Sequence, residues 1–98
     1  MTRVWTHGNS VVKAGTEAAF EEAWTRLARA AMGAYEGEPP ILLRDREHPN
    51  VFKTFGAWPS IEAIEAFRAS DLFRGAVDEI RPLLESFEPF ALDEIEWA

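Results

Sequence analysis

The stretch Val51-Phe52-Lys53-Thr54-Phe55-Gly56-Ala57-Trp58-Pro59-Ser60 is the part of the sequence that says most about the fold. Its first eight residues include several β-branched and aromatic side chains, and this composition predicts a strand over 51–58. Successive side chains of a strand point to opposite faces, so Phe52 and Trp58 lie on one face and Phe55 lies on the other. The Pro-Ser pair that follows predicts the start of a helix.

The segments on both sides of this strand predict the rest of the fold. In chain order they are a strand over 3–12, a helix that begins after the cap Thr16 and ends near Gly33 and Gly37, a strand over 41–47, a helix opened by Ser60, a helix opened by Ser70, and a strand over 90–97. The turn His48-Pro49-Asn50 joins strands 41–47 and 51–58 into a hairpin. Pro82 lacks a backbone donor and predicts a kink or an end of the last helix. This order predicts a single α+β domain, residues 1–98, with a ferredoxin-like antiparallel sheet and its helices on one face.

Large apolar side chains fall on both faces of the predicted sheet. In the strand over 3–12, Trp5 and Val11 lie on the face opposite to Val4 and Val12. Helices on one side leave the other face uncovered, and a sheet face that meets water usually carries polar residues. We therefore expect a second copy of the chain to cover that face, which gives a homodimer that associates through its sheets.

Composition excludes several classes of protein. The chain has 98 residues, a formal net charge of −7 and no cysteine. The negative charge, most of which lies in residues 71–98, disfavours nucleic-acid binding, and the lack of cysteine removes disulfides, thiolate catalysis and cysteine-ligated metals. No apolar run approaches the ~18 residues of a membrane helix, and the N-terminus does not resemble a signal peptide. We therefore expect a cytoplasmic protein with no membrane or nucleic-acid partner.

Few residues have the chemistry of a catalytic group. The two histidines, His7 and His48, are far apart in the sequence and have no matching carboxylate, so no metal site is expected. No serine lies in a Gly-x-Ser-x-Gly context, and the glycines form no phosphate-binding motif. His7 and Asn9 share one face of the strand over 3–12, where a neutral imidazole can act as a base and an amide as an oxyanion donor. The alternative is a structural role in hydrogen bonding or at the dimer contact.

Aromatic side chains offer a possible binding surface. The chain contains four tryptophans, one tyrosine and seven phenylalanines. Most of them must pack in the core or at the dimer contact, but an aromatic slot between helices and sheet suits a flat apolar ligand. Tyr35 and Trp58 also carry a polar atom. Core packing alone is the alternative for each of these side chains.

Two segments resemble the antibiotic biosynthesis monooxygenase family. Residues Phe55-Gly56-Ala57-Trp58-Pro59-Ser60 are similar to that family's strand ending in Trp-x-Ser. Residues Phe67-Arg68-Ala69-Ser70-Asp71-Leu72-Phe73 are similar to its helix start Ser-x-x-Phe. The opening strand, the turn at Gly15 and Leu43-Arg44-Asp45 also resemble the family, so the likeness covers essentially the whole chain.

This resemblance implies a fold, an assembly and a function. Members dimerise through their sheets into an α+β barrel, and each copy keeps a pocket between its sheet and its helices. Several of them oxidise phenols or quinols with molecular oxygen and need no metal or flavin cofactor. For a small aromatic substrate, we expect Tyr35 and Trp58 to line the slot, with Phe67 and Phe73 contributing. His7 acts as the base and Asn9 as the oxyanion donor, provided that their face opens on the pocket.

Other functions remain open on the same fold. A non-catalytic domain can bind a small hydrophobic molecule or serve in assembly, and isomerase or cyclase chemistry occurs on a similar fold. A haem-degrading branch of the family uses an asparagine, a tryptophan and a histidine, but those positions fall near Gly8, Phe67 and Val77 here. The axial histidine is missing, so haem degradation is not expected.

Overall fold

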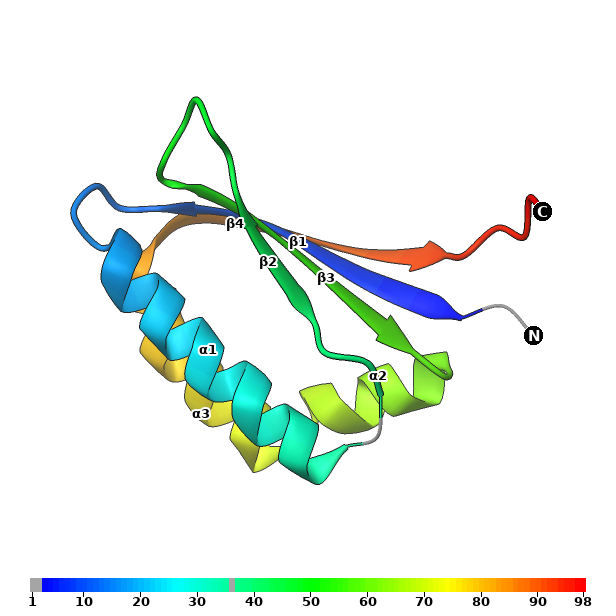
Figure 1. The fold of residues 1–98 in the computed structure, drawn as a ribbon. Coiled ribbons are helices and arrows are strands. Elements are labelled where there is room, and N and C mark those ends of the chain that lie inside the picture. Colours follow the sequence, from blue (N-terminus) through cyan, green and yellow to red (C-terminus); the bar gives the residue numbers. More distant parts are fainter. Residues whose placement is uncertain (1–2, 36) are drawn as a thin grey trace.

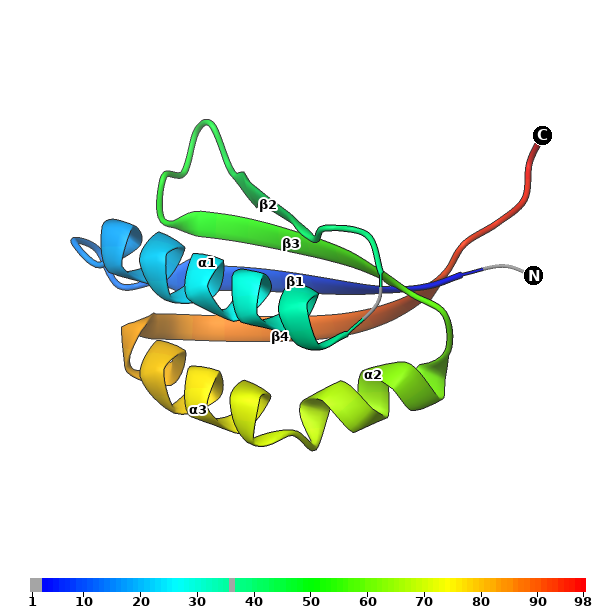
Figure 2. The same cartoon turned by 60° about the horizontal axis from the view of Figure 1, so that its bottom comes forward.

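The computed structural model describes residues 3–35 and 37–98, and its elements follow the predicted order. Four strands form one sheet in the order β2-β3-β1-β4, in which all neighbours are antiparallel. They are β1 (Val4–Val12), β2 (Ile41–Arg44), β3 (Val51–Trp58) and β4 (Leu84–Asp93). The helices α1 (Glu17–Ala34), α2 (Ile61–Arg68) and α3 (Asp71–Ile80) lie on one side of the sheet (Figure 1, Figure 2). This arrangement confirms the ferredoxin-like α+β fold.

The register of the strands fixes which residues share a face. Directly paired residues of antiparallel neighbours point to the same side. Ser10 pairs with Phe52, and both are buried beneath the helices. His7 pairs with Phe55 on the opposite side, which no helix covers (Figure 2). We call this uncovered side the open face. The predicted placement of Phe52 and Trp58 on one face and Phe55 on the other is therefore confirmed.

The core lies where α1 packs against the centre of the sheet. Val12, Phe20 and Phe52 expose 0%, 2% and 1% of their surface, and the rings of Phe20 and Phe52 lie 4.8 Å apart. Partly buried apolar residues from α1, α3, the 3₁₀ turn and the strands pack against them, namely Trp24, Leu42, Ile80, Leu83 and Leu84. Each fully buried side chain of this size stabilises the fold by roughly 1.5–3 kcal/mol, so this cluster holds the helices to the sheet.

The last strand begins at Leu84 and ends at Asp93, so the predicted range of 90–97 was wrong at both ends. The helix α3 ends at Ile80, and a 3₁₀ turn over Arg81–Leu83 contains Pro82. The Lys13 N–H donates to the Leu83 carbonyl at 2.8 Å, which brings the chain beside β1 directly after the turn. The predicted end of the helix near Pro82 is confirmed, and the apolar residues after it belong to the strand.

The second strand also differs from its predicted range, because it stops at Arg44 and not at residue 47. Asp45 ends it by forming a turn. Its Oδ1 atom accepts hydrogen bonds from the N–H groups of Glu47 at 2.8 Å and His48 at 2.9 Å. Both bonds stabilise the charged carboxylate, the one from His48 more than the one from Glu47. They hold the pKa of Asp45 below its ordinary value.

Serine caps begin the two short helices, as predicted. Ser60 Oγ accepts the Ala63 N–H at 3.2 Å, and Ser70 Oγ accepts the Phe73 N–H at 3.2 Å. Thr16 precedes α1 but does not cap it, which corrects the prediction. Its hydroxyl donates instead to the Lys13 carbonyl at 2.6 Å, and this bond closes the turn before the helix.

Gly75 offers a direct test of the helix assignment. It lies inside α3, and a Cβ atom added there would meet nothing within 4 Å. We expect Gly75→Ala to stabilise the protein by about 1 kcal/mol, because alanine loses less backbone freedom than glycine in a helix. Thermal unfolding should then occur roughly 4–8 °C higher. A lower melting temperature would show that this segment is not a regular helix.

Candidate functional site

Four aromatic side chains from four different segments meet on the helix-covered side of the sheet. Phe67 on α2 lies at the centre, with its ring centroid 5.2 Å from Trp58 at the end of β3 and 5.2 Å from Phe73 on α3. Tyr35, directly after α1, approaches Phe67 edge-on at 5.3 Å. We call these four residues the aromatic cluster. The structure therefore brings together all four residues that the sequence placed in a substrate slot.

The serine after α2 sets the geometry of this cluster. Ser70 Oγ donates to the Phe67 carbonyl at 2.6 Å and also accepts the Phe73 N–H. One hydroxyl group thus joins the end of α2 to the start of α3 and fixes Phe67 relative to Phe73. Phe67 exposes only 8% of its surface, so the cluster is closed at its centre by its own side chains.

Small residues form the surface of the sheet between the aromatic cluster and the core. On the covered face, Thr6 pairs with Gly56 and Gly8 pairs with Thr54. We call these four residues the floor. Trp58 Nε1 donates to Thr6 Oγ1 at 3.1 Å, and Thr54 Oγ1 accepts the Gly8 N–H at 3.1 Å. The floor therefore presents the hydroxyl group of Thr6 next to an indole, and that of Thr54 two residues beyond Gly56 along β3.

Gly8 is required by this close packing. A Cβ atom at Gly8 would lie 2.8 Å from Thr54 Oγ1, closer than real Cβ contacts, and 3.0 Å from a ring carbon of Phe87, at the tight limit of such contacts. Three of the floor residues keep intermediate exposure although they lie beneath the helices, namely Thr6, Thr54 and Gly56. Solvent therefore reaches part of the floor beside the closed cluster.

Other surface features do not compete with this location. Two shallow hollows lie elsewhere and are lined by charged and polar side chains, one along α1 by Glu21, Glu22, Thr25, Arg26 and Arg29, the other after β2 by Arg44, Asp45, Arg46 and Pro49. Within the described ranges, no group of three or more histidine or acidic side chains is arranged to hold a metal ion. In the same ranges, every helix is too short or too polar to cross a membrane.

His7 lies on the open face, away from the aromatic cluster. Its ring is stacked between Phe55 and Phe90, and its centroid lies 4.5 Å from that of Phe55 and 5.5 Å from that of Phe90. His7 Nδ1 lies 3.0 Å from the Thr54 carbonyl oxygen, and a carbonyl can only accept, so Nδ1 carries the hydrogen. Asn9 shares this face, where its Oδ1 accepts from Lys53 Nζ at 3.3 Å.

This placement corrects the roles predicted for His7 and Asn9. A general base must lie within roughly 2.6–3.2 Å of the proton that it removes, directly or through one water. The backbone of β1 separates both side chains from the aromatic cluster, since residues with odd numbers in this strand point to the open face. The condition for their catalytic roles, a face that opens on the pocket, is therefore not met.

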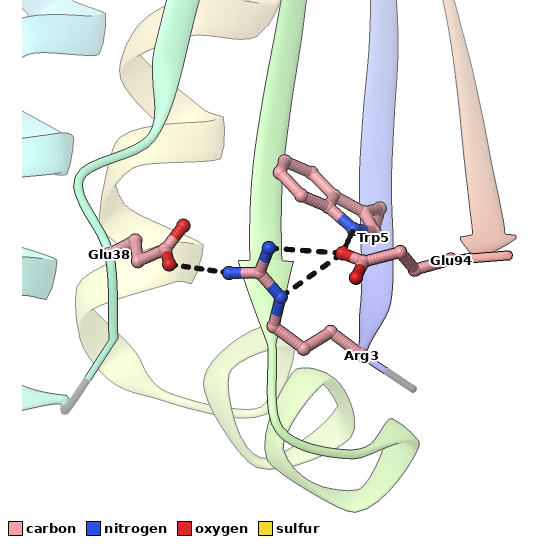
Figure 3. A network of polar contacts seen from close by, with 4 residues as sticks. All are labelled: Arg3, Trp5, Glu38 and Glu94. Atoms are coloured by element: carbon pink, nitrogen blue, oxygen red, sulfur yellow. Dashed lines mark hydrogen bonds and ion pairs between the residues drawn. The ribbon is translucent and has the colours of Figure 1, made fainter. Parts of the chain in front are cut away.

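A polar network closes one end of the open face (Figure 3). Glu94 Oε1 accepts from Trp5 Nε1 at 2.7 Å and from Arg3 Nε at 3.1 Å, and Arg3 also pairs with Glu38 before β2. The hydrogen bond from Trp5, followed by the charge of Arg3, holds the pKa of Glu94 below its ordinary value. The network joins the start of β1 and the residue after β4 to the connection between α1 and β2.

Sequence reasoning missed the two threonines of the floor. Thr6 and Thr54 were assigned no role because neither belongs to a catalytic motif. Strand alternation places Thr6 on the same face as Val4 and Val12, and this was the signal in the sequence from which its position could have been predicted. Only the pairing of β1 with β3 places Thr6 beside Trp58 and Thr54 opposite Gly8 on the same face.

Comparison with solved structures shows the same fold at low sequence identity. A protein from Caulobacter crescentus, provisionally described as an antibiotic biosynthesis monooxygenase, has a TM-score of 0.89 and 21% identity, with 97% of this chain and 92% of that chain covered. SnoaB from Streptomyces nogalater, described as a cofactor-independent oxygenase, has a TM-score of 0.85 and 22% identity, with 98% and 96% covered. PA3566 from Pseudomonas aeruginosa has a TM-score of 0.85 and 17% identity, with 98% and 97% covered.

The sequence itself identifies the family. No curated protein sequence matches the chain significantly. The sequence profile of one protein family, antibiotic biosynthesis monooxygenase, matches residues 6–79, a range that contains most of β1, all of β2 and β3, and the three helices except the last residue of α3. The aromatic cluster and the floor lie entirely within the matched range. Because this match spans most of the chain, the protein belongs to the antibiotic biosynthesis monooxygenase family.

Proposed function

We propose that the chain is a cytoplasmic, homodimeric monooxygenase that oxidises a small electron-rich aromatic molecule, a phenol or quinol, with molecular oxygen and without a metal or flavin. The observation that carries this proposal is the aromatic cluster beside the floor of small and hydroxyl-bearing residues. Aromatic side chains bind a flat ring by stacking or edge contacts, and hydroxyl groups orient its oxygen atoms. SnoaB, a structural relative described as a cofactor-independent oxygenase, supports the same chemistry.

The substrate supplies the electrons in this chemistry. Loss of a proton from an electron-rich phenol or anthrone gives an anion that can pass an electron to oxygen. In an anthrone the CH2 group becomes C=O, one oxygen atom stays in the product, and the other leaves as water, so no external reductant is needed. The protein must bind the ring, hold its oxygen atom and exclude water.

Named side chains can perform these tasks. Trp58, which is only partly buried, offers a ring surface for the substrate, and the buried ring of Phe67 packs against it. Thr6 Oγ1 accepts the hydrogen of Trp58 Nε1 at 3.1 Å, and its own hydroxyl donates to the Gly56 carbonyl at 3.5 Å, a long bond that a substrate oxygen can replace. Tyr35 is the titratable side chain of the aromatic cluster, and we assign it the exchange of a proton with the substrate.

The open face supports the dimer. Its exposed apolar residues come from both edge strands, Ile41 at 48%, Leu43 at 49%, Phe90 at 43% and Leu92 at 42% exposed. Contiguous apolar surface of this kind is typical of interaction sites. The free edge strand β4 carries Pro89 and acidic residues, which disfavour association edge to edge. A second copy of the chain, packed face to face, is therefore the partner that we propose.

A non-catalytic role in binding a small hydrophobic molecule or in assembly is the second candidate. One observation favours it, because His7 and Asn9 lie on the open face and Tyr35 is left as the titratable side chain of the cluster. An enzyme usually places several titratable groups in its site. A binding domain needs only the rings and the hydroxyl groups.

Oxygen consumption separates these two candidates. We would measure oxygen uptake by the metal-stripped protein with hydroquinones, 1-naphthol and anthrone, and follow the incorporation of labelled oxygen into the product. The proposal expects uptake above autoxidation, with one labelled atom in the anthrone product. Binding of these compounds without uptake would support the non-catalytic candidate and contradict the oxygenase.

A further inference from the structure

The edge strand β4 is accessible to solvent even on the covered face of the sheet. Directly paired residues point to the same side, so four residues of β4 share the face of the floor, namely Phe87, Pro89, Ala91 and Asp93. All four are exposed, Phe87 to 51%, whereas Phe52 of β3 on the same face exposes only 1%. A small molecule can therefore reach the covered face from the side of β4.

Asp93 brings a carboxylate to this accessible side. It pairs with Val4 of β1, and Trp58 of β3 pairs with Val4 from the other side, so two strand spacings of roughly 10 Å separate Asp93 from Trp58. Among residues 3–35 and 37–98, the hydrogen bonds and ion pairs of carboxylates all involve other acids. The Asp93 oxygen atoms are therefore free to accept hydrogen bonds from a ligand.

The next residue, Glu94, has a different role. It points to the open face, where its carboxylate accepts from Trp5 at 2.7 Å and from Arg3 at 3.1 Å (Figure 3). These bonds fix the end of β4 against β1. Asp93 is therefore held in place by its neighbour, and its own charge is not used to hold the strands together.

Val4 and Thr6 form the surface between Trp58 and Asp93. Both point to the covered face, and both are partly exposed. Asp93 lies diagonally across from Thr6, which pairs with Ala91, and diagonal neighbours in antiparallel strands are about 7–8 Å apart. A flat ring that lies on Val4 beside the Trp58 indole can therefore place one oxygen at Thr6 Oγ1 and a polar group of its far side at Asp93.

We propose that Asp93 is a substrate-binding residue that selects aromatic molecules with two hydroxyl groups on opposite sides of the ring. One oxygen binds at Thr6, and the second hydroxyl donates to the Asp93 carboxylate. A hydrogen bond to a charged acceptor is stronger than one between neutral groups. This inference rests on the proposed function and narrows its substrate class from phenols and quinols to quinols.

Three naphthalene compounds test the role of Asp93. Naphthalene-1,4-diol carries the second hydroxyl, 1-naphthol lacks it, and 4-hydroxy-1-naphthoate has a carboxylate in its place. We would titrate each without oxygen, which prevents oxidation of the diol, and follow the Trp58 indole N–H signal by NMR. The full chain should bind the diol about tenfold more tightly than 1-naphthol. It should bind the naphthoate most weakly, because two carboxylates repel each other.

Asp93→Ala should change these affinities in opposite directions. The preference for the diol over 1-naphthol should fall to within about twofold, while binding of the naphthoate should improve at least about threefold. General damage to the site would weaken all three compounds together. Asp78→Ala is the matched control, because it removes an exposed aspartate from α3, and it should keep the affinities of the original chain.

The outcomes separate this inference from the proposed function. If the original chain binds the diol and 1-naphthol equally, or if Asp93→Ala keeps the preference for the diol, the role of Asp93 is wrong, and the binding of 1-naphthol near Trp58 still stands. If neither compound shifts the Trp58 signal, the proposed site fails and this inference fails with it. A preference for the diol that disappears in Asp93→Ala and persists in Asp78→Ala is the expected result.

Discussion

Replacing Phe67 by alanine is expected to lower the free energy of unfolding by about 3–5 kcal/mol. Phe67 exposes 8% of its surface and contacts three other aromatic rings, so its removal leaves a cavity where α2 meets the sheet. A loss of this size is a large fraction of the stability of a small domain, and we expect partial unfolding at room temperature. Denaturant titration followed by circular dichroism measures the effect.

Phe67→Leu is the control for this prediction. Leucine keeps most of the volume and should cost less than about 1.5 kcal/mol, so the fold is retained while the aromatic contacts are lost. If binding of 1-naphthol falls in the folded Phe67→Leu variant, the ring itself contributes to the site. An alanine variant as stable as the original chain would show that the aromatic cluster does not hold α2 in place.

Replacing Trp58 by leucine is expected to lower kcat/KM for an oxidised aromatic substrate by roughly 10- to 100-fold. The change removes a ring that offers a stacking surface and the N–H that binds Thr6 Oγ1 at 3.1 Å. Thr6 then loses one of the two hydrogen bonds that hold its hydroxyl group in place. Trp58 is only partly buried, so the fold should persist, and thermal unfolding would verify this.

Trp97→Leu is the matched control, because it makes the same chemical change at a side chain that is 90% exposed and outside the site. Its kcat/KM should equal that of the original chain. Equal losses in the two variants would mean that the effect does not arise at the aromatic cluster. No loss in Trp58→Leu would remove Trp58 from the substrate site.

The fold was largely predictable from the sequence because the strands alternate regularly between their two faces and two of the helices begin at serine caps. Strand alternation placed Phe52 and Phe55 on opposite faces, and the polar side chains of Ser60 and Ser70 marked two helix starts. The start of β4 was not predictable in the same way. Leu84 continues the apolar spacing of α3, and only the turn at Pro82 transfers it to the sheet.

The candidate site was predictable only in part. The four members of the aromatic cluster came from short family motifs and aromatic content, and the structure places them in contact. The side on which His7 lies could not be deduced, since both faces of β1 carry apolar residues and either one could have met the helices. Phe20, which packs on Phe52, decides this, and a contact between α1 and β3 is not visible in local sequence.

The location of the site is the central claim, and the tryptophan indole groups report on it directly. Trp58 borders the floor, Trp5 lies on the open face, and Trp97 lies beyond β4. We would titrate isotope-labelled protein with 1-naphthol and follow the indole N–H signals by NMR. The account predicts a large, saturable shift of the Trp58 signal and of the Thr6 and Gly56 amides, with Trp97 unchanged. Shifts confined to Trp5 and the amides around His7 would place the ligand on the open face and contradict the account.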